Sequence, residues 1–243
     1  MADPLGLAFD ALAEDYDLGR PPWPPELLDG IDGVAALDLA AGTGKLTSLL
    51  VDRFEDVYAV EPLAGMRTVL ARNVPSAHVL PGGAERIPLD DASVDAAFVA
   101  EAFHWFDSKA AVNELARVLR AGGTVTVSFN DWLGFEPALP QELRAVLAAA
   151  WEGLPPPGGP KVQSGEWKLG FADSVFAPLE EMHHRHEWRT SRDSIAAYFV
   201  STSSMGSLPP GDRAALRSRI IELLEPVDYR LELDAHAFRT LRA

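Results

Sequence analysis

Short apolar runs alternate with stretches of helical periodicity over the first half of the chain. The runs have the length of buried strands, and the stretches between them place apolar residues three and four positions apart, as one buried helix face requires. Strands that alternate with helices in this way predict an α/β fold with a largely parallel sheet. The expected strands are residues 36–39, 56–60, 77–80, 94–100 and 124–129, and the expected helices between them include 46–54, 66–70 and 108–120.

The two ends of the chain carry other patterns. An amphipathic helix is expected at residues 7–19, and the proline-rich segment 20–25 stops it and runs extended. A short helix over 26–30 leads into the first strand. Beyond Asn130 the pattern predicts helices at 139–150, 194–200 and 212–225, strands at 182–188 and 229–233, and an irregular proline loop at 155–160.

The first predicted strand ends in a turn of small residues between Asp38 and Thr47. Glycine has no Cβ and adopts positive φ, so a ligand can lie against the backbone and meet the free N–H groups of the following helix. A dinucleotide-binding fold requires a third glycine where Thr47 stands. A P-loop requires four residues between its first glycine and its Gly-Lys pair, whereas this chain has one. The pattern Asp-x-Ala-x-Gly-x-Gly matches as it stands. It resembles motif I of the class I S-adenosylmethionine-dependent methyltransferases.

An acidic residue follows the second predicted strand. Glu61 lies about twenty residues beyond the glycines, where a carboxylate in such folds holds a ribose hydroxyl pair. A carboxylate only accepts hydrogen bonds, which suits two adjacent O–H donors. Together with the turn, this spacing favours a ribose contact over a solvated loop acid.

The resemblance extends over residues 9–130. The leader, with Tyr16 and Arg20, resembles that of small-molecule methyltransferases of the ubiquinone/menaquinone-biosynthesis and trans-aconitate type. The segment 82–89 resembles the adenine-binding turn, but the family often has an acid where Gly83 stands, so Glu85 or the backbone of Ala84 would have to serve. The resemblance implies cofactor contacts from Tyr16, Arg20, Asp38, Ala40, Gly42, Gly44, Glu61, Pro62, Met66, Gly83, Ala84, Glu85 and Glu101.

The same resemblance implies the fold and its division. The expected fold is Rossmann-like, with a seven-stranded, mostly parallel sheet, an antiparallel strand 7 and a C-terminal inserted lid. Residues 1–130 would form the cofactor-binding core with its leader. Residues 131–226 would form a substrate lid that includes strand 6, and 227–243 would complete the sheet.

Charge and composition exclude several classes of function. The formal net charge is −15 over 243 residues, and such a field repels nucleic-acid backbones. The chain has no cysteine, so disulfides, thiolate nucleophiles and cysteine-ligated metals are absent. It also has no signal pattern and no apolar run of membrane-spanning length. We therefore expect a cytoplasmic monomer or homodimer that binds neither nucleic acid nor membrane.

The segment after the fourth strand carries the candidate chemistry. In open α/β sheets ligands lie beyond the carboxyl ends of strands, where His104 and Trp105 stand. Methyl transfer mainly requires alignment, and a base only where the attacking atom arrives protonated. His104 is the candidate base or substrate contact, against the alternative of a packing residue. Trp105, Trp132 and Ser201 are the other expected substrate contacts.

Three histidines, His183, His184 and His186, raise a metal interpretation. On a strand His184 and His186 share a face, yet no third ligand is spaced nearby, so no metal is expected. The sequence therefore predicts an S-adenosylmethionine-dependent methyltransferase that acts on oxygen, nitrogen or carbon of a small molecule, with secondary metabolism as the expected setting. A non-methyl reaction such as cyclisation on the same fold, or a protein or nucleic-acid methyltransferase, remains the alternative.

Overall fold

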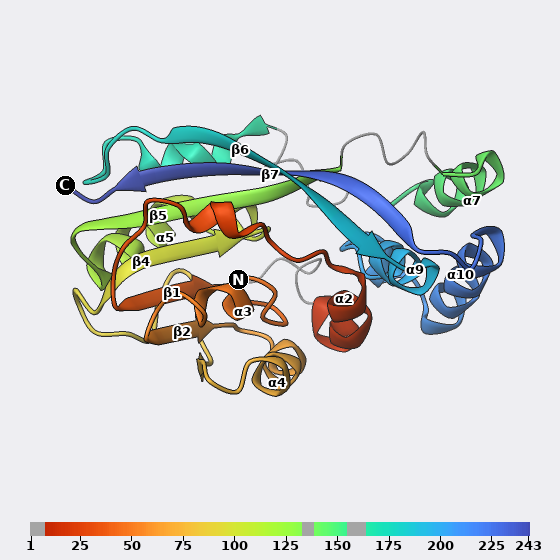
Figure 1. Ribbon diagram of the computed structural model, residues 1–243, viewed down its shortest axis with the longest axis horizontal. Helices are drawn as coiled ribbons and strands as arrows, with labels where there is room; N and C mark the ends of the chain where they lie inside the picture. The colour runs from red at the N-terminus through yellow and green to blue at the C-terminus, as the bar shows by residue number, and fades with distance from the viewer. Residues whose placement is uncertain (1–7, 133–138, 155–163) are drawn as a thin grey trace.

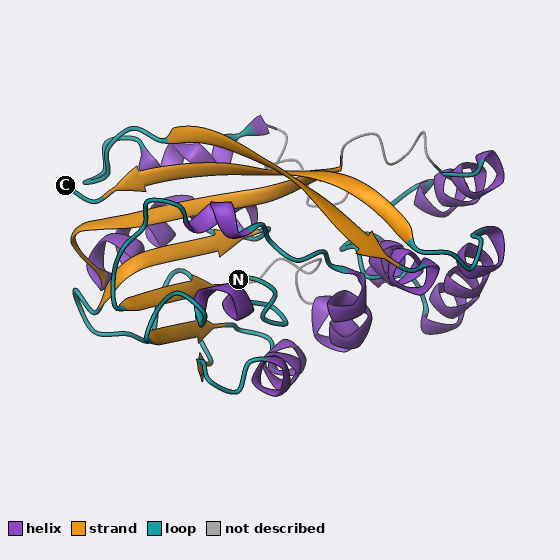
Figure 2. Cartoon of the chain, in the orientation of Figure 1, coloured by secondary structure: helices purple, strands orange, loops and turns teal. Residues whose placement is uncertain are grey.

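The computed structural model describes residues 8–132, 139–154 and 164–243, which form one seven-stranded sheet flanked by helices (Figures 1 and 2). In spatial order the strands are β3, β2, β1, β4, β5, β7 and β6. The first five strands of the chain are parallel, and β7 runs antiparallel between β5 and β6. The predicted Rossmann-like class I sheet is therefore confirmed. The strands are β1 (Ala35–Leu39), β2 (Asp56–Val60), β3 (His78–Leu80), β4 (Val94–Ala100), β5 (Leu119–Trp132), β6 (Glu180–Thr190) and β7 (Tyr229–Leu241).

The centre of the sheet is buried because its strands are apolar on both faces. All five residues of β1 are buried, and Phe98 on β4 is fully enclosed. Three helices cross between the parallel strands: α3 (Thr47–Leu50), α4 (Ala64–Asn73) and α5 (Ser108–Val118). Asp107 caps α5 by accepting a hydrogen bond from the backbone N–H of Ala110 at 3.1 Å.

Several elements end at other residues than the pattern predicts. The helix after the glycine turn is only the four residues of α3, although apolar spacing continues to Phe54. The helix α5 ends at Val118, because Leu119 already pairs with Val94 of β4 before a register shift. The last strand continues to Leu241 because β7 has a hydrogen-bonded neighbour on both sides. Such pairing partners are distant in sequence, so local periodicity does not reveal them.

The C-terminal helices gather at one end of the molecule, beyond the carboxyl ends of the parallel strands (Figure 1). These helices are α7 (Gln141–Trp151), α9 (Arg192–Val200) and α10 (Pro210–Leu223), with the short helix η5 (Met205–Ser207). They share an apolar cluster that includes Leu143, Ile195 and Ile220 and continues onto β6 and β7. The strand β6 from the same part of the chain lies in the main sheet. The predicted boundaries of a lid stay a prediction, and the proline loop at 155–160 lies outside the described residues.

The leader packs against this helical group. It consists of η1 (Ala8–Leu12), α2 (Ala13–Gly19), an extended segment and η2 (Pro25–Leu28). α2 approaches α9 so closely that a Cβ on Gly19 would lie 2.3 Å from the backbone nitrogen of Tyr198. Two further short helices, η3 (Phe103–Trp105) and η4 (Glu166–Phe171), complete the described elements. In the described part of the chain, no helix combines the length and the apolar character needed to cross a membrane.

Candidate functional site

The turn after β1 has the backbone conformation that its sequence predicts. Ala40, Gly42 and Gly44 have φ of 59°, 57° and 92°, in the region that favours glycine. A Cβ on Gly42 would meet only Tyr16, at 3.7 Å, so its backbone faces open space. A Cβ on Gly44 would lie 3.1 Å from the side chain of Val74, the residue that caps the C-terminus of α4. Glycine at this position therefore allows the turn to pack closely against the end of α4. The two glycines therefore have different roles.

Asp38 lies beneath the turn and is 1% exposed. Its Oδ2 accepts a hydrogen bond of 2.6 Å from the hydroxyl of Thr47. Burial raises the pKa of Asp38 to about 7, with a further raising effect from Glu61, against the lowering effect of the Thr47 bond. A group with this pKa changes charge near neutral pH.

Glu61 joins the end of β2 to the turn. Its Oε2 accepts a hydrogen bond from the backbone N–H of Gly42 at 3.0 Å, and its Oε1 accepts one from Leu63 at 2.8 Å. Burial raises the pKa of Glu61, and these two hydrogen bonds oppose that shift. Each carboxylate oxygen keeps a further lone pair for another donor.

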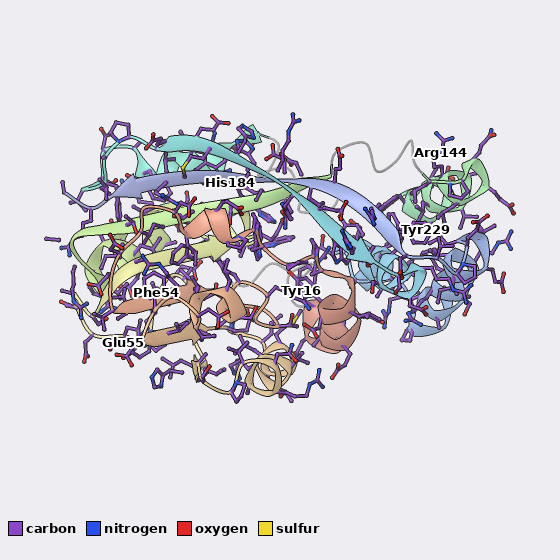
Figure 3. All side chains as sticks on the ribbon, in the orientation of Figure 1. Tyr16, Phe54, Glu55, Arg144, His184 and Tyr229 are labelled. Atoms are coloured by element: carbon purple, nitrogen blue, oxygen red, sulfur yellow. The ribbon has the colours of Figure 1, made fainter. Side chains whose placement is uncertain are left out.

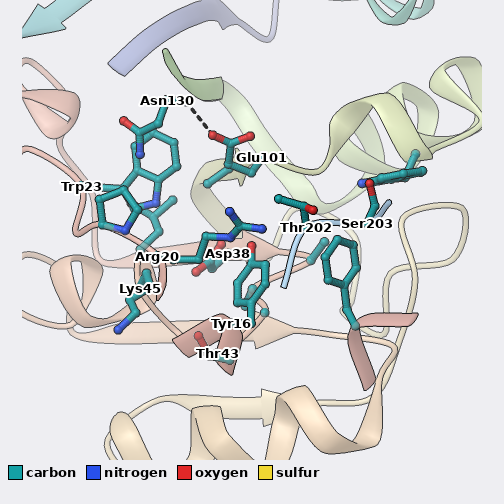
Figure 4. Close-up of a pocket in the computed structure, with 18 of the residues that line it drawn as sticks. Tyr16, Arg20, Trp23, Asp38, Thr43, Lys45, Glu101, Asn130, Thr202 and Ser203 are labelled. Carbon is teal, nitrogen blue, oxygen red and sulfur yellow. Dashed lines mark hydrogen bonds between the residues drawn. The ribbon is translucent and has the colours of Figure 1, made fainter. Parts of the chain in front are cut away.

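Two adjoining hollows run along the carboxyl ends of the strands. The larger has a volume of about 860 Å³ and the smaller, shown in Figure 4, about 210 Å³. Both are lined by parts of the leader, the glycine turn and the end of β4. Their shared lining residues are Phe9, Tyr16, Ala40, Gly42, Ala100, Glu101 and Trp105.

The structure brings most of the predicted site residues together around these hollows. Every predicted cofactor contact except Gly44 lines at least one of them, and His104 and Trp105 line the smaller one. Ser201 is buried beside the smaller hollow rather than in its wall, and its backbone oxygen accepts a hydrogen bond from Arg20 at 3.2 Å. The side chain of Trp132 lies outside the described part. The site roles themselves stay predictions.

Glu101 lines both hollows and directly follows the end of β4. It has a φ of 55° without being glycine, a strained conformation that neighbouring bonds maintain. Its backbone N–H donates to Ser128 at 2.9 Å, and its Oε1 accepts from the backbone of Asn130 at 2.6 Å (Figure 4). Burial raises the pKa of Glu101, and the nearby Arg20 opposes the shift.

Arg20 connects the leader to the C-terminal helices. Its guanidinium carbon lies 4.4 Å from the ring centre of Tyr16 and 4.7 Å from that of Tyr198. Both contacts have the geometry of cation–π interactions. Arg20 thereby links α2 to α9 in the wall of the smaller hollow. Lys45, which lines the same hollow, is paired with Asp17 at 3.0 Å.

His104 lies in η3 and is 5% exposed. Its ring centre is 4.7 Å from that of Trp105 and 5.9 Å from that of Phe129. It thus both packs against aromatic rings and lines the smaller hollow, so its position fits either interpretation drawn from the sequence.

Other lining residues of the smaller hollow were not predicted from the sequence. Tyr198, Thr202 and Ser203 come from the end of α9 and the polar run behind it, and Asn130 comes from β5. The polar run was a visible signal, but its position depends on the docking of α9 on α2. That contact joins segments about 180 residues apart, which no local pattern specifies.

Known proteins share this sequence pattern. A model of the methyltransferase domain matches residues 37–127. An uncharacterized methyltransferase of Schizosaccharomyces pombe is 31% identical over 251 residues, covering 98% of this chain and 95% of that protein. An uncharacterized methyltransferase of Mycobacterium tuberculosis is 49% identical over 129 residues, covering 52% of this chain and 53% of that protein. The chain thus spans about half the length of the first curated relatives it matches.

A solved structure shares the fold. A candidate type II methyltransferase from Anaeromyxobacter dehalogenans superposes with a TM-score of 0.64 at 25% sequence identity. The match covers 92% of this chain and 97% of that chain, so it includes C-terminal elements as well as the parallel strands.

Proposed function

Since this chain belongs to the class I S-adenosylmethionine-dependent methyltransferases, we propose that it transfers a methyl group from S-adenosylmethionine to a small-molecule acceptor. One observation carries the proposal. The glycine turn lines both of the adjoining hollows, with Glu61 in the wall of the larger and His104 in the wall of the smaller, so cofactor-type and acceptor-type side chains lie side by side.

The residues of the larger hollow fit the proposed cofactor. Glu61 offers free lone pairs for the ribose hydroxyls, and Gly42 leaves its backbone open to a close approach. At Gly83 a Cβ would meet only Glu85 Oε2, at 3.6 Å, so this position also faces open space. Ala84 and Glu85 would frame the adenine. Tyr16, which lines both hollows, would lie at the methionine end, where the cofactor meets Arg20 of the smaller hollow. The bound cofactor would supply an electrophilic methyl group on a sulfonium.

The smaller hollow is the proposed acceptor site. Its volume of about 210 Å³ suits a small molecule, and the net charge of −15 disfavours polyphosphate substrates. The chain's contribution would be to hold the attacking atom in line with the methyl group and to exclude water. His104 would contact the acceptor and, where that atom carries a proton, accept it on a ring nitrogen. The helices α7, α9 and α10 would act as the lid.

The cofactor assignment is tested by calorimetric titration with S-adenosylmethionine, S-adenosylhomocysteine and NAD. We expect micromolar binding of the first two and none of the third; a preference for NAD would overturn the assignment. Glu61→Gln should weaken cofactor binding by about 1–3 kcal/mol, because the buried ribose hydroxyls would lose a carboxylate oxygen that accepts their hydrogen bond.

Glu55→Gln is the matched control. Glu55 is an exposed carboxylate just before the start of β2, at the opposite end of the sheet from Tyr16 (Figure 3). Its substitution should leave the dissociation constant of the cofactor unchanged.

Methyl transfer itself is tested by mass spectrometry of metabolite extracts incubated with the protein and cofactor, in which an acceptor should gain the mass of one methyl group. Consumption of an extract component with no methyl gain would indicate a non-methyl reaction instead.

A further inference from the structure

The outer strands β6 and β7 carry a cluster of metal-ligating side chains outside the two hollows. Glu181 and His183 are two residues apart on β6, so they share a face of the strand. His236 on β7 is directly opposite His183 in the register. One ligand atom from each of the three residues lies within 4.8 Å of the other two. The sequence alone offers His183, His184 and His186, places only His184 and His186 on a common face, and predicts no metal.

A carboxylate lies beside Nδ1 of each imidazole. The Nδ1 of His183 is hydrogen-bonded to Oδ2 of Asp234 at 2.7 Å, and the Nδ1 of His236 is 3.6 Å from Oδ2 of Asp131, which is an ion-pair distance. Each ring therefore turns its other nitrogen toward Glu181: the distances from Nε2 to Oε1 are 4.0 Å for His183 and 2.5 Å for His236. Metal-ligating histidines commonly have this arrangement, with one nitrogen toward the metal and the other held by a carboxylate.

We propose that Glu181, His183 and His236 bind one zinc-type divalent transition-metal ion on the face of the β6–β7 pair. Two imidazole nitrogens and one carboxylate oxygen are a donor set that Zn²⁺ takes, with the fourth position left to water.

Coordination requires a local rearrangement. The rings of His183 and His236 are stacked, with centres 4.3 Å apart and planes at 15°. The Nε2 of His236 donates to Oε1 of Glu181, so its proton must leave when the ion binds. One ring must tilt out of the stack for both Nε2 atoms to reach about 2.0–2.1 Å from a shared ion. Glu181 and His183 are exposed and have room for this movement. The ion would replace the hydrogen bond between His236 and Glu181 and join β6 to β7.

The test is calorimetric titration of the full chain with ZnCl₂, and with MgCl₂ as a hard cation that two imidazoles do not suit. We expect one Zn²⁺ site and no Mg²⁺ binding there. His236→Ala and His183→Ala should each weaken Zn²⁺ affinity at least 10-fold. Asp234→Asn should weaken it about 10–100-fold, since it removes the carboxylate that orients His183.

His184→Ala is the matched control, one residue along β6 and on its opposite face. It should bind Zn²⁺ as tightly as the original chain. Equal losses in His184→Ala and His183→Ala, or no Zn²⁺ uptake by the original chain, would overturn the site. X-ray absorption of the zinc-loaded chain decides the case even if a variant misfolds: two histidine nitrogens are expected, and a shell of oxygen alone contradicts the proposal. None of these readouts depends on methyl transfer.

Discussion

At the residue scale, three carboxyl groups define the electrostatics of the site: Asp38 and Glu61 are buried, and Glu101 is half-buried. Asp38, Glu61 and Glu101 all have a pKa raised by burial, because little water is present to stabilise their charge. Arg20 is the cation that opposes the shift at Glu101. A cationic ligand would recover part of this cost, which suits a cofactor that carries a sulfonium and an amino group.

Asp38 gives a pH dependence of stability with a definite sign. Its pKa is about 7 in the folded chain against an ordinary 3.8, so between these values the folded state binds more protons than the unfolded state. Stability therefore falls as pH rises from about 4 to 7, by about 3–5 kcal/mol for this group, and then levels off. In Asp38→Asn the urea-unfolding free energy should lose this part of the slope, and parallel pH profiles for the two proteins would contradict it.

His104 is the second prediction at this scale. It is wedged between Trp105 and Phe129 at the wall of the smaller hollow, so we expect it to position the acceptor. Once an acceptor has been identified, His104→Asn should raise the KM for that acceptor and leave both kcat and the affinity for S-adenosylhomocysteine near their original values. A fall in kcat of about 10²–10⁴-fold at unchanged KM would instead indicate that His104 removes a proton.

At the scale of elements, the site depends on how closely α2 meets α9. Gly19→Ala would place a Cβ 2.3 Å from the backbone nitrogen of Tyr198 and force the two helices apart. We expect a loss of about 1–3 kcal/mol in unfolding free energy and weaker cofactor binding, because Tyr16, Arg20 and Tyr198 would separate. Urea unfolding and calorimetry measure the two effects.

Gly211→Ala is the control for this substitution. Gly211 is in the first turn of α10, where an added Cβ meets nothing within 4 Å. Alanine there should be neutral or stabilise by about 0.4–1 kcal/mol. If the two variants behave alike, the close approach of α2 and α9 does not limit stability.

The contact between α2 and α9 also illustrates what the sequence could and could not predict. The glycine turn, Glu61 and the strands that place them are local patterns, so the parallel half of the sheet and the position of these residues at the carboxyl ends of its strands were predictable. Tyr198 and Thr202 reach the hollow only through the docking of α9, which tertiary packing decides. The cross-strand pair of His183 and His236 likewise follows from the register of β6 and β7, and periodicity in one strand cannot reveal it.

At the scale of the whole molecule, the hollows lie between three distant parts of the chain. The leader supplies Tyr16, the strand ends supply Asp38 and Glu61, and the C-terminal helices supply Thr202. A ligand in this space would contact all three parts at once. Its binding should therefore stabilise their mutual packing, and not only the strands that carry the glycine turn.

Hydrogen exchange with and without S-adenosylhomocysteine measures this coupling. At about 100 times its dissociation constant, the ligand should add about 2.7 kcal/mol to the unfolding free energy. Amides of residues 13–19 and 192–200 should slow by more than amides of residues 180–184 at the outer edge of the sheet. Equal slowing everywhere would mean that the leader and α9 open only with the whole fold. Full protection of both helices in the free protein would make them fixed walls, and the acceptor would then have to enter past other residues.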